Sequence, residues 1–322
     1  MDDIVDIKEN YILRLNKSLL KILLFDRSSQ KNIIWATDNY AIRGDGYDFT
    51  DTIDVDRISG RNGKIIKPRV EKSKREKATR IRDKAEVFTP SWVCNAQNNL
   101  IDEAWFGRKN VFNKETEKGW QTNIELISFS DEKTWQKYVA AIRMEITCGE
   151  APYLVSRYDT VSGKIIKPND RIGLLDRKIR IVNENTENEE QWYKWVIIAY
   201  QSVYGFDWQG DNVFLARENL LFSFIDYYIK RFYKEPSIKQ IKEIARIISW
   251  NIWQMDGLKF VIPNSCKPTK SKQISIFEEK ECKECLGCKN GDNQNHIGIY
   301  CKIKDWRSHK IVKYSSFIKR GK

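Results

Sequence analysis

Residues 145–154 (EITCGEAPYL) constrain the fold of this chain more than any other stretch. Apolar residues lead into a Cys-Gly turn, an acid follows, and an aromatic-apolar pair resumes. This pattern is typical of a buried strand that ends in a tight turn before a helix. Gly149 would let the backbone approach a ligand closely, and a helix after the turn would direct N–H groups at that ligand. Taken alone, the segment also fits a purely structural turn.

The same strand–turn–helix order continues downstream. Helices are predicted at 189–202, 212–232 and 236–248, with strands at 203–207 and 250–253. The segments 172–175 and 179–182 (IGLL and IRIV) are expected to be short strands in an intervening loop region. This order predicts an α/β fold with a doubly wound, mostly parallel sheet of Rossmann type. Ligands of such sheets bind outside the carboxyl ends of the strands.

Composition favours a polyanionic partner and argues against a membrane protein. The 322 residues are 41% hydrophobic, and no apolar run approaches the length that spans a bilayer. The net charge is +12, and eleven tryptophans could add stacking surfaces for nucleic acid. The first residues lack the order of a signal peptide, and seven cysteines without an export signal indicate a reducing compartment. We therefore expect a cytoplasmic protein with no membrane partner.

Three regions are predicted along the chain. Residues 1–85 form an N-terminal α+β region with a basic arm, 86–265 the main α/β domain, and 266–322 a Cys-rich tail. The arm, 61–84, holds eleven Lys and Arg residues against three acids. A solvated helix or linker explains such a run as well as a segment that follows DNA phosphates does. The candidate nucleic-acid contacts are Arg69, Lys72, Lys74, Arg75, Lys77 and Arg80.

Four segments also occur in an informative order: 87–90 (VFTP), 145–154, 204–221 (YGFDWQGDNVFLARENLL) and 251–258 (NIWQMDGL). This order resembles the cofactor half of the DNA adenine-N6 methyltransferases, the modification subunits of restriction–modification systems. The sequence of 88–108 (FTPSWVCNAQNNLIDEAWFGR) and of 251–258 is also similar to bacterial proteins labelled restriction endonuclease subunit M, and the likeness covers most of the chain.

The resemblance implies a Rossmann-like methyltransferase fold that binds S-adenosylmethionine. It places Asp207 at the ribose hydroxyls and Asp256 at the adenine amino group, where carboxylates are suitable acceptors. The other cofactor-binding residues it implies are Phe88, Thr89, Pro90, Glu145, Thr147, Cys148 and Gly149. It further implies double-stranded DNA as a partner, together with a catalytic or specificity subunit.

The chain departs from this family at two places. Ala151 and Pro152 stand where the family has the second glycine of its turn. The catalytic tetrapeptide with a Pro-Pro pair, whose aromatic ring stacks on a flipped base, is missing from the sequence. Catalytic residues are therefore not assigned. Either another subunit supplies that loop, or the fold serves binding alone.

Two alternatives stay open. The chain could be a restriction nuclease, with Asp170, Asp176 and Lys178 loosely matching acids and a lysine around a divalent ion, although a charged loop explains them better. It could also be a non-catalytic DNA-binding subunit on a degenerate methyltransferase fold.

The tail contains four cysteines with metal-site spacing. Cys282, Cys285 and Cys288 lie two residues apart, and Cys301 follows a loop that contains His296. Thiolates at this spacing grip one ion in a tight turn, so the tail predicts structural zinc, with an iron–sulfur cluster as the less favoured metal. Cys301 is expected to be the fourth ligand, with His296 competing for that place. Cys94, Cys148 and Cys266 are expected to be isolated thiols.

Overall fold

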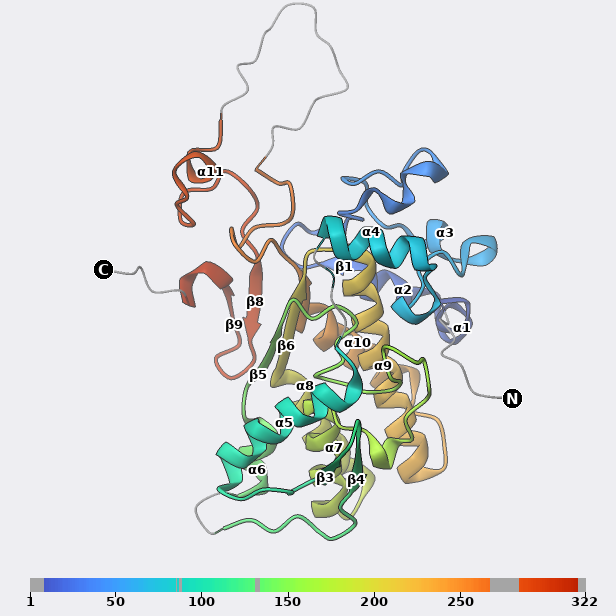
Figure 1. Ribbon diagram of the computed structural model, residues 1–322, viewed down its shortest axis with the longest axis vertical. Helices are drawn as coiled ribbons and strands as arrows, with labels where there is room; N and C mark the ends of the chain where they lie inside the picture. The colour runs from blue at the N-terminus through green and yellow to red at the C-terminus, as the bar shows by residue number, and fades with distance from the viewer. Residues whose placement is uncertain (1–8, 85, 87–88, 131–133, 267–283, 318–322) are drawn as a thin grey trace, which may run out of the picture.

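A computed structural model describes residues 9–84, 86, 89–130, 134–266 and 284–317 (Figure 1). At its centre lies a parallel sheet in the order β5-β6-β7, built from β5 (Arg143–Ile146), β6 (Val203–Asp207) and β7 (Ile252–Gln254). The α/β class is thus confirmed. The larger doubly wound sheet of a Rossmann-like fold is not established, because this parallel sheet has three strands in the part of the chain that the structure describes.

Helices connect the three strands, as the sequence predicts. α8 (Glu189–Gln201) precedes β6, α9 (Gly210–Phe232) follows it, and α10 (Ile238–Asn251) leads into β7. Asn188 caps α8, and Ser237 with Gln240 forms a capping box at α10, so local sequence defines both helix starts. α9 is buried along most of its length because apolar residues surround its axis.

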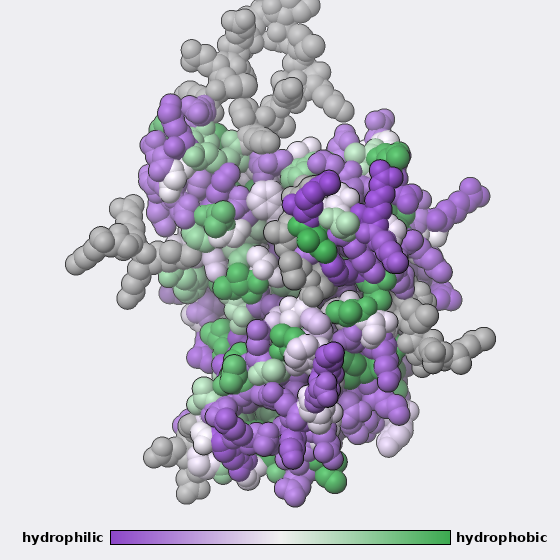
Figure 2. All heavy atoms as spheres, in the orientation of Figure 1, coloured by the Kyte–Doolittle hydropathy of each residue, from purple (hydrophilic) through white to green (hydrophobic). Residues whose placement is uncertain are grey.

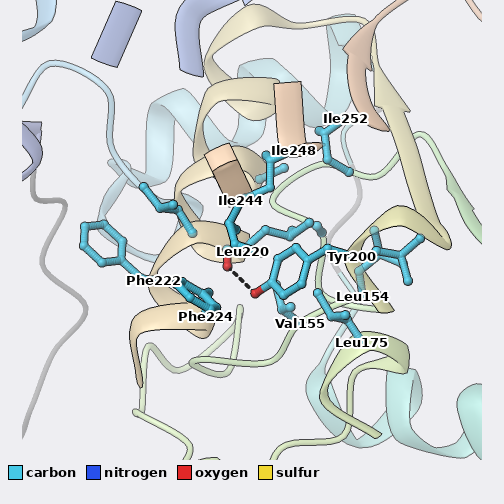
Figure 3. Packing of buried hydrophobic residues seen from close by; sticks show 14 of the residues in the cluster. Leu154, Val155, Leu175, Tyr200, Leu220, Phe222, Phe224, Ile244, Ile248 and Ile252 are labelled. Carbon is cyan, nitrogen blue, oxygen red and sulfur yellow. Dashed lines mark hydrogen bonds between the residues drawn. The ribbon is translucent and has the colours of Figure 1, made fainter. Parts of the chain in front are cut away.

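The sheet is buried on both faces, and alternate side chains divide between them. Val203 and Ile252 belong to the large hydrophobic cluster under the helices, whereas Tyr204, Phe206 and Trp253 point to the other face. In the large cluster, the Tyr200 hydroxyl donates to the Leu220 carbonyl, 2.8 Å away (Figure 3). A hairpin of β8 (Lys302–Asp305) and β9 (Lys310–Lys313) covers the opposite face.

The N-terminal segment shares this core. α2 (Lys17–Leu24) packs against α10, and its four buried leucines join the large cluster. The buried Arg217 of α9 donates to the carbonyls of Phe25 at 3.1 Å and Ile252 at 2.8 Å. One guanidinium therefore links the N-terminal segment to the sheet. The other N-terminal elements are α1 (Glu9–Leu15), β1 (Phe25–Asp26), β2 (Lys31–Asn32), η1 (Asp38–Arg43), α3 (Val55–Ile58), η2 (Gly60–Asn62), η3 (Arg69–Glu71) and α4 (Lys74–Lys84).

The region before and after β5 is mainly helical. The predicted strands at 172–175 and 179–182 are wrong, because α7 (Leu174–Asn185) occupies this stretch. Asp176 accepts the Gly173 N–H at 3.0 Å and so caps the helix, which buries Leu175, Ile179 and Val182 on one side. The remaining elements are α5 (Ser91–Phe106), β3 (Asn113–Thr116), β4 (Gly119–Thr122), α6 (Trp135–Ala140), η4 (Pro168–Asp170), α11 (Leu286–Asn290) and η5 (Tyr314–Phe317).

Candidate functional site

The carboxyl edge of the parallel sheet brings three of the predicted cofactor-binding acids to one side of the molecule. Glu145 lies in β5, Asp207 ends β6, and Asp256 follows β7 by two residues. Because the three strands are adjacent and parallel, their carboxyl ends meet at a common edge. The turn after β5 reaches the next strand directly, since Gly149 N donates to Asp207 Oδ2 at 2.9 Å.

Each of these acids holds a backbone turn. Glu145 accepts the Leu154 N–H at 3.2 Å, Asp207 also accepts the Gln209 N–H at 3.0 Å, and Asp256 accepts the Leu258 N–H at 3.0 Å. These contacts give the carboxylates a structural role. A carboxylate can accept several hydrogen bonds, so a ligand at this edge would share the acids with these amides.

The turn itself adopts an unusual backbone. Thr147, Gly149 and Ala151 have positive φ of 53°, 52° and 63°. Ala151 stands where the resembled family has glycine, and its left-handed conformation is one that glycine adopts without strain. A non-glycine residue in this region costs about 1 kcal/mol or more. The left-handed backbone at Ala151 therefore comes at an energetic cost.

Burial sets the charge of the acids at this edge. Desolvation raises the pKa of Asp207 to about 6, even though the Gln209 and Gly149 amides favour its ionised form. Desolvation also raises the pKa of Glu145 well above its ordinary value, and the neighbouring Asp207 charge adds to this effect. Polar donors from a ligand would favour the ionised carboxylates, so both groups suit hydroxyl or amine recognition.

Three polar residues that the sequence did not single out extend this edge. The buried Glu86 accepts Gln209 Nε2 at 3.0 Å, and Asn212 Nδ2 lies 3.4 Å from both Glu86 and Asp207. Gln209 is the N-cap residue of α9 and Asn212 lies in its first turn, so their position just after β6 was the signal available in the sequence. For Glu86 the sequence offered no comparable signal, because its partners Gln209 and Asn212 are more than 120 residues away.

Thr89 and Pro90 are the described residues of the VFTP segment that the resemblance assigns to cofactor binding. Pro90 is the N-cap residue of α5, and the Thr89 carbonyl accepts the Thr160 hydroxyl at 2.9 Å. Phe88 lies outside the described residues. The positions of Thr89 and Pro90 thus follow from the start of α5, and their expected role toward a cofactor stays a prediction.

The basic arm folds onto the protein, which corrects two of its predicted nucleic-acid contacts. Arg80 and Lys72 are 0% and 3% exposed, and both form ion pairs with Asp211 in the first turn of α9. Tyr40 donates its hydroxyl to the same carboxylate at 2.8 Å, and Arg80 Nη1 also donates to Glu86 at 2.9 Å. Since burial of an unpaired charge is expensive, these paired cations serve the fold and do not face solvent.

The other arm residues differ in exposure. Arg69 is half-buried and donates to the Glu86 carbonyl at 3.2 Å, and Lys77 Nζ donates to the Val70 carbonyl at 2.9 Å. Lys74 and Arg75 are exposed. Hydrophilic side chains gather over α4 in the space-filling view (Figure 2). Of the six predicted contacts, Lys74 and Arg75 are thus the ones that are exposed to solvent, and their role toward a nucleic acid stays a prediction.

A second candidate site lies beyond β7. The ligand atoms of Cys266, Cys285, Cys288 and His296 lie within 4.8 Å of one another and could hold a metal ion. His296 Nδ1 is 3.5 Å from Cys285 Sγ and 3.6 Å from Cys288 Sγ. Metal–sulfur and metal–nitrogen bonds of about 2.3 and 2.0 Å place tetrahedral S and N ligands about 3.5 Å apart. The spacing of the donors therefore fits a four-coordinate ion.

Local structure explains why these side chains converge. Cys285 is the N-cap residue of α11, and Cys288 follows within that helix, so the two thiols lie on one side of its first turn. A Cβ on Gly287 would lie 2.7 Å from His296 Nδ1, and a Cβ on Gly298 would lie 2.8 Å from Cys266 Sγ. Only glycine permits these approaches without displacement of a ligand.

Electrostatics around Cys285 favour a ligand thiolate. Burial acts to raise the pKa of this thiol, but the Ile297 and Cys288 amides and the His296 ring together lower it to about 6. The Ile297 N–H lies 3.4 Å from Cys285 Sγ. In contrast, burial raises the pKa of Cys266 to about 12. A bound cation would stabilise both thiolates.

The predicted metal ligands are thus partly corrected. Cys285 and Cys288 belong to the group, and His296 takes the place expected for Cys301. The Cys301 thiol is fully buried against the sheet and donates to the Gln254 carbonyl at 3.3 Å. Cys266, expected to be an isolated thiol, is the additional member, because the bridges Asp256–Val261 and Val261–Tyr300 bring its segment beside the tail. Cys282 lies outside the described residues.

The alternative nuclease residues are occupied by structural contacts. Asp176 accepts the N–H groups of Ser156 at 2.8 Å and Gly173 at 3.0 Å, as well as the Tyr227 hydroxyl at 3.0 Å. Lys178 is buried and donates to the Ala141 carbonyl, and desolvation lowers its pKa well below the ordinary value. These contacts explain the two residues as parts of the fold around α7.

Comparison of the chain with known protein families, with curated proteins and with solved structures finds no match. The fold and the sites therefore define an α/β protein with a Cys₃His group that could hold a metal ion. No helix among the described residues has both the length and the apolar character needed to cross a bilayer.

Proposed function

We propose that this protein binds S-adenosylmethionine at the carboxyl edge of the β5-β6-β7 sheet and acts on double-stranded DNA as a methyltransferase-like component of a restriction–modification or phage-defence system. The supporting observation is that Glu145, Asp207 and Asp256 come from three adjacent parallel strands, with the Gly149 turn against Asp207. The resemblance to adenine-N6 methyltransferases supplies the identity of the cofactor.

Asp207 is the central residue of this proposal. Its carboxylate would accept the two ribose hydroxyls, and Asp256 would accept the adenine amino group. Glu145 would hold the turn through Leu154, as it does in the structure, so that Gly149 stays close to the ligand. Methyl transfer to adenine N6 would need a partner subunit with the base-binding loop, because the sequence has no Pro-Pro pair.

Isothermal titration calorimetry with S-adenosylmethionine tests the cofactor part. We expect saturable binding by the wild-type chain and at least a tenfold loss in Asp207→Asn, which keeps the side-chain shape and removes the charge. Asp38→Asn changes an exposed acid at the start of η1 and should bind like wild type. Thermal melting shows whether each variant is folded. Absence of wild-type heat, or equal binding by Asp207→Asn, would refute the site.

We further propose that the Cys₃His group holds structural Zn²⁺. Mixed sulfur and nitrogen donors at tetrahedral spacing suit this ion. Elemental analysis of the purified chain should find about one zinc per molecule, and Cys285→Ser with Cys288→Ser should remove it. Cys94→Ser, at a buried thiol in α5, serves as the control and should retain zinc. If the analysis instead finds iron, together with a visible charge-transfer band, the result would contradict zinc and support an iron–sulfur site.

A further inference from the structure

Three hollows on the surface join into one groove along the N-terminal helices, α10 and the C-terminal hairpin. They have volumes of about 1060, 400 and 450 Å³. The first two share Lys21 and Phe25, and the last two share Arg27 and Arg246. We call this surface the α2–α10 groove.

Cationic side chains dominate the α2–α10 groove. Arg14, Lys17 and Lys21 line one end, and Arg27, Lys239, Arg246 and Lys304 line the remainder. The acids of the lining are Asp54, Asp56 and Glu243. None of the seven cations makes a salt bridge with a carboxylate among the residues that the structure describes. By contrast, the buried cations Lys72, Arg80 and Arg177 pair with carboxylates, and the buried Lys178 and Arg217 donate to backbone carbonyls.

Two like charges lie together at the junction of the hollows. Arg27 donates to Ser249 Oγ at 3.0 and 2.8 Å, and its guanidinium lies over the rings of Phe25 at 5.0 Å and Trp250 at 5.4 Å. Burial, followed by the positive charge of the nearby Arg246, lowers the pKa of Arg27, and the adjacent Asp26 carboxylate opposes this effect. A hydroxyl and two aromatic faces hold this guanidinium, which makes no salt bridge within the described part of the chain. The arrangement is one that an anion would stabilise.

The exposed cations of the groove follow two helices that lie side by side. Lys17 and Lys21 are four residues apart on α2, and Lys239 and Arg246 are seven apart on α10, so each pair shares one helix face. At the far end, Lys304 Nζ lies 4.1 Å from the Trp306 ring centre. The positive charge is therefore spread along the groove, which suits a chain of phosphates better than one small anion.

We infer that the α2–α10 groove binds the sugar-phosphate backbone of double-stranded DNA. This inference rests on the proposed DNA partner and names the surface that meets it. It places the contact on residues that the sequence did not single out, in contrast to the arm, whose Lys72 and Arg80 are held inside. The groove cations supply affinity and positioning, because phosphate contacts carry no sequence information.

Fluorescence anisotropy with a labelled 25-base-pair duplex tests the groove on the full-length chain. The groove variant is Lys17→Gln/Lys21→Gln/Arg246→Gln. The control variant, Lys114→Gln/Lys164→Gln/Lys167→Gln, loses the same charge at exposed positions outside the groove. Each phosphate contact contributes about 0.9 to the slope of log K against log salt. We expect the groove variant to lose about 2.7 from this slope and more than tenfold in affinity at about 0.1 M salt.

The outcomes separate this inference from the proposed function. If wild type binds the duplex and the groove variant matches the control in affinity and slope, the groove is not the DNA-binding surface, and the proposal of a DNA partner is unaffected. If wild type does not bind the duplex, both fail. A second experiment measures binding to vesicles that contain phosphatidylserine. If the chain binds these vesicles through the groove and does not bind DNA, the inference is overturned in favour of a membrane surface. Circular dichroism confirms that all variants are folded.

Discussion

Arg80→Ala and Arg75→Ala on the same helix should differ strongly in their effect on stability. Arg75 is exposed on α4, whereas Arg80, six residues before Glu86 in sequence, is fully buried and contacts both Glu86 and Asp211. We expect Arg80→Ala to destabilise the protein strongly and Arg75→Ala to have little effect. The pair of variants thus tests whether the arm belongs to the fold or to a DNA-binding surface.

The magnitude follows from the partners that Arg80 would leave behind. Its removal leaves the carboxylates of Asp211 and Glu86 buried with fewer compensating donors. Loss of one partner from a buried ion pair costs about 3–5 kcal/mol. Lys72, 3.5 Å from Asp211, and the Tyr40 hydroxyl stay in place, so the lower end of that range applies. Substitution of an exposed arginine changes stability by less than about 0.5 kcal/mol.

Urea denaturation followed by tryptophan fluorescence measures this difference. With a slope of about 3 kcal/mol per molar urea, a loss of about 3 kcal/mol shifts the midpoint by about 1 M. Arg80 and Lys72 hold the pKa of Asp211 below its ordinary value, although burial opposes this. A depressed carboxyl pKa stabilises the fold above the unfolded value of about 3.9 and loses that contribution as pH falls toward the folded pKa. The difference in free energy of unfolding between wild type and Arg80→Ala should therefore become smaller below about pH 4.

A midpoint shift below about 0.3 M for Arg80→Ala, together with a lower DNA affinity, would refute the reasoning. That result would mean that the arm leaves Asp211 in solution and presents Arg80 to a partner. Equal destabilisation by Arg75→Ala would also contradict it, because both arginines would then be structural.

Three further predictions follow from the sites. Affinity for S-adenosylmethionine should fall up to tenfold per pH unit below about pH 6, because protonation of Asp207 removes the charged acceptor, and calorimetry of Asp207→Asn should show no such dependence. Gly298→Ala should displace Cys266 Sγ and reduce bound metal, measured by elemental analysis, whereas Gly119→Ala, whose nearest contact is the flexible Thr116 hydroxyl at 3.2 Å, should retain it. Asp176→Ala should lower the free energy of unfolding by about 3 kcal/mol, because it removes the α7 cap and several buried hydrogen bonds. The wild-type chain should not cut DNA in the presence of Mg²⁺. Cleavage that depends on Asp176 would instead support the nuclease alternative.

The sequence by itself determined the local features of this protein. Ser237 with Gln240 begins α10, Asn188 begins α8, and the order of strand, turn and helix predicts the parallel sheet that aligns Glu145, Asp207 and Asp256. The spacing of Cys285 and Cys288 likewise predicts two metal ligands. Each of these signals depends on neighbours within one turn or one strand, so sequence patterns can carry them.

Only the tertiary structure decided which charges and thiols meet. Arg80 and Asp211 are 131 residues apart, and nothing in a run of basic residues shows which one will be buried. Cys266 belongs to the Cys₃His group because strand bridges bring its segment beside the tail. Cys301 does not belong to it, because its thiol is buried against the sheet. The α2–α10 groove arises in the same way, from two helices more than 200 residues apart. Pairing of distant segments depends on packing of the whole core, and that information is spread over the entire chain.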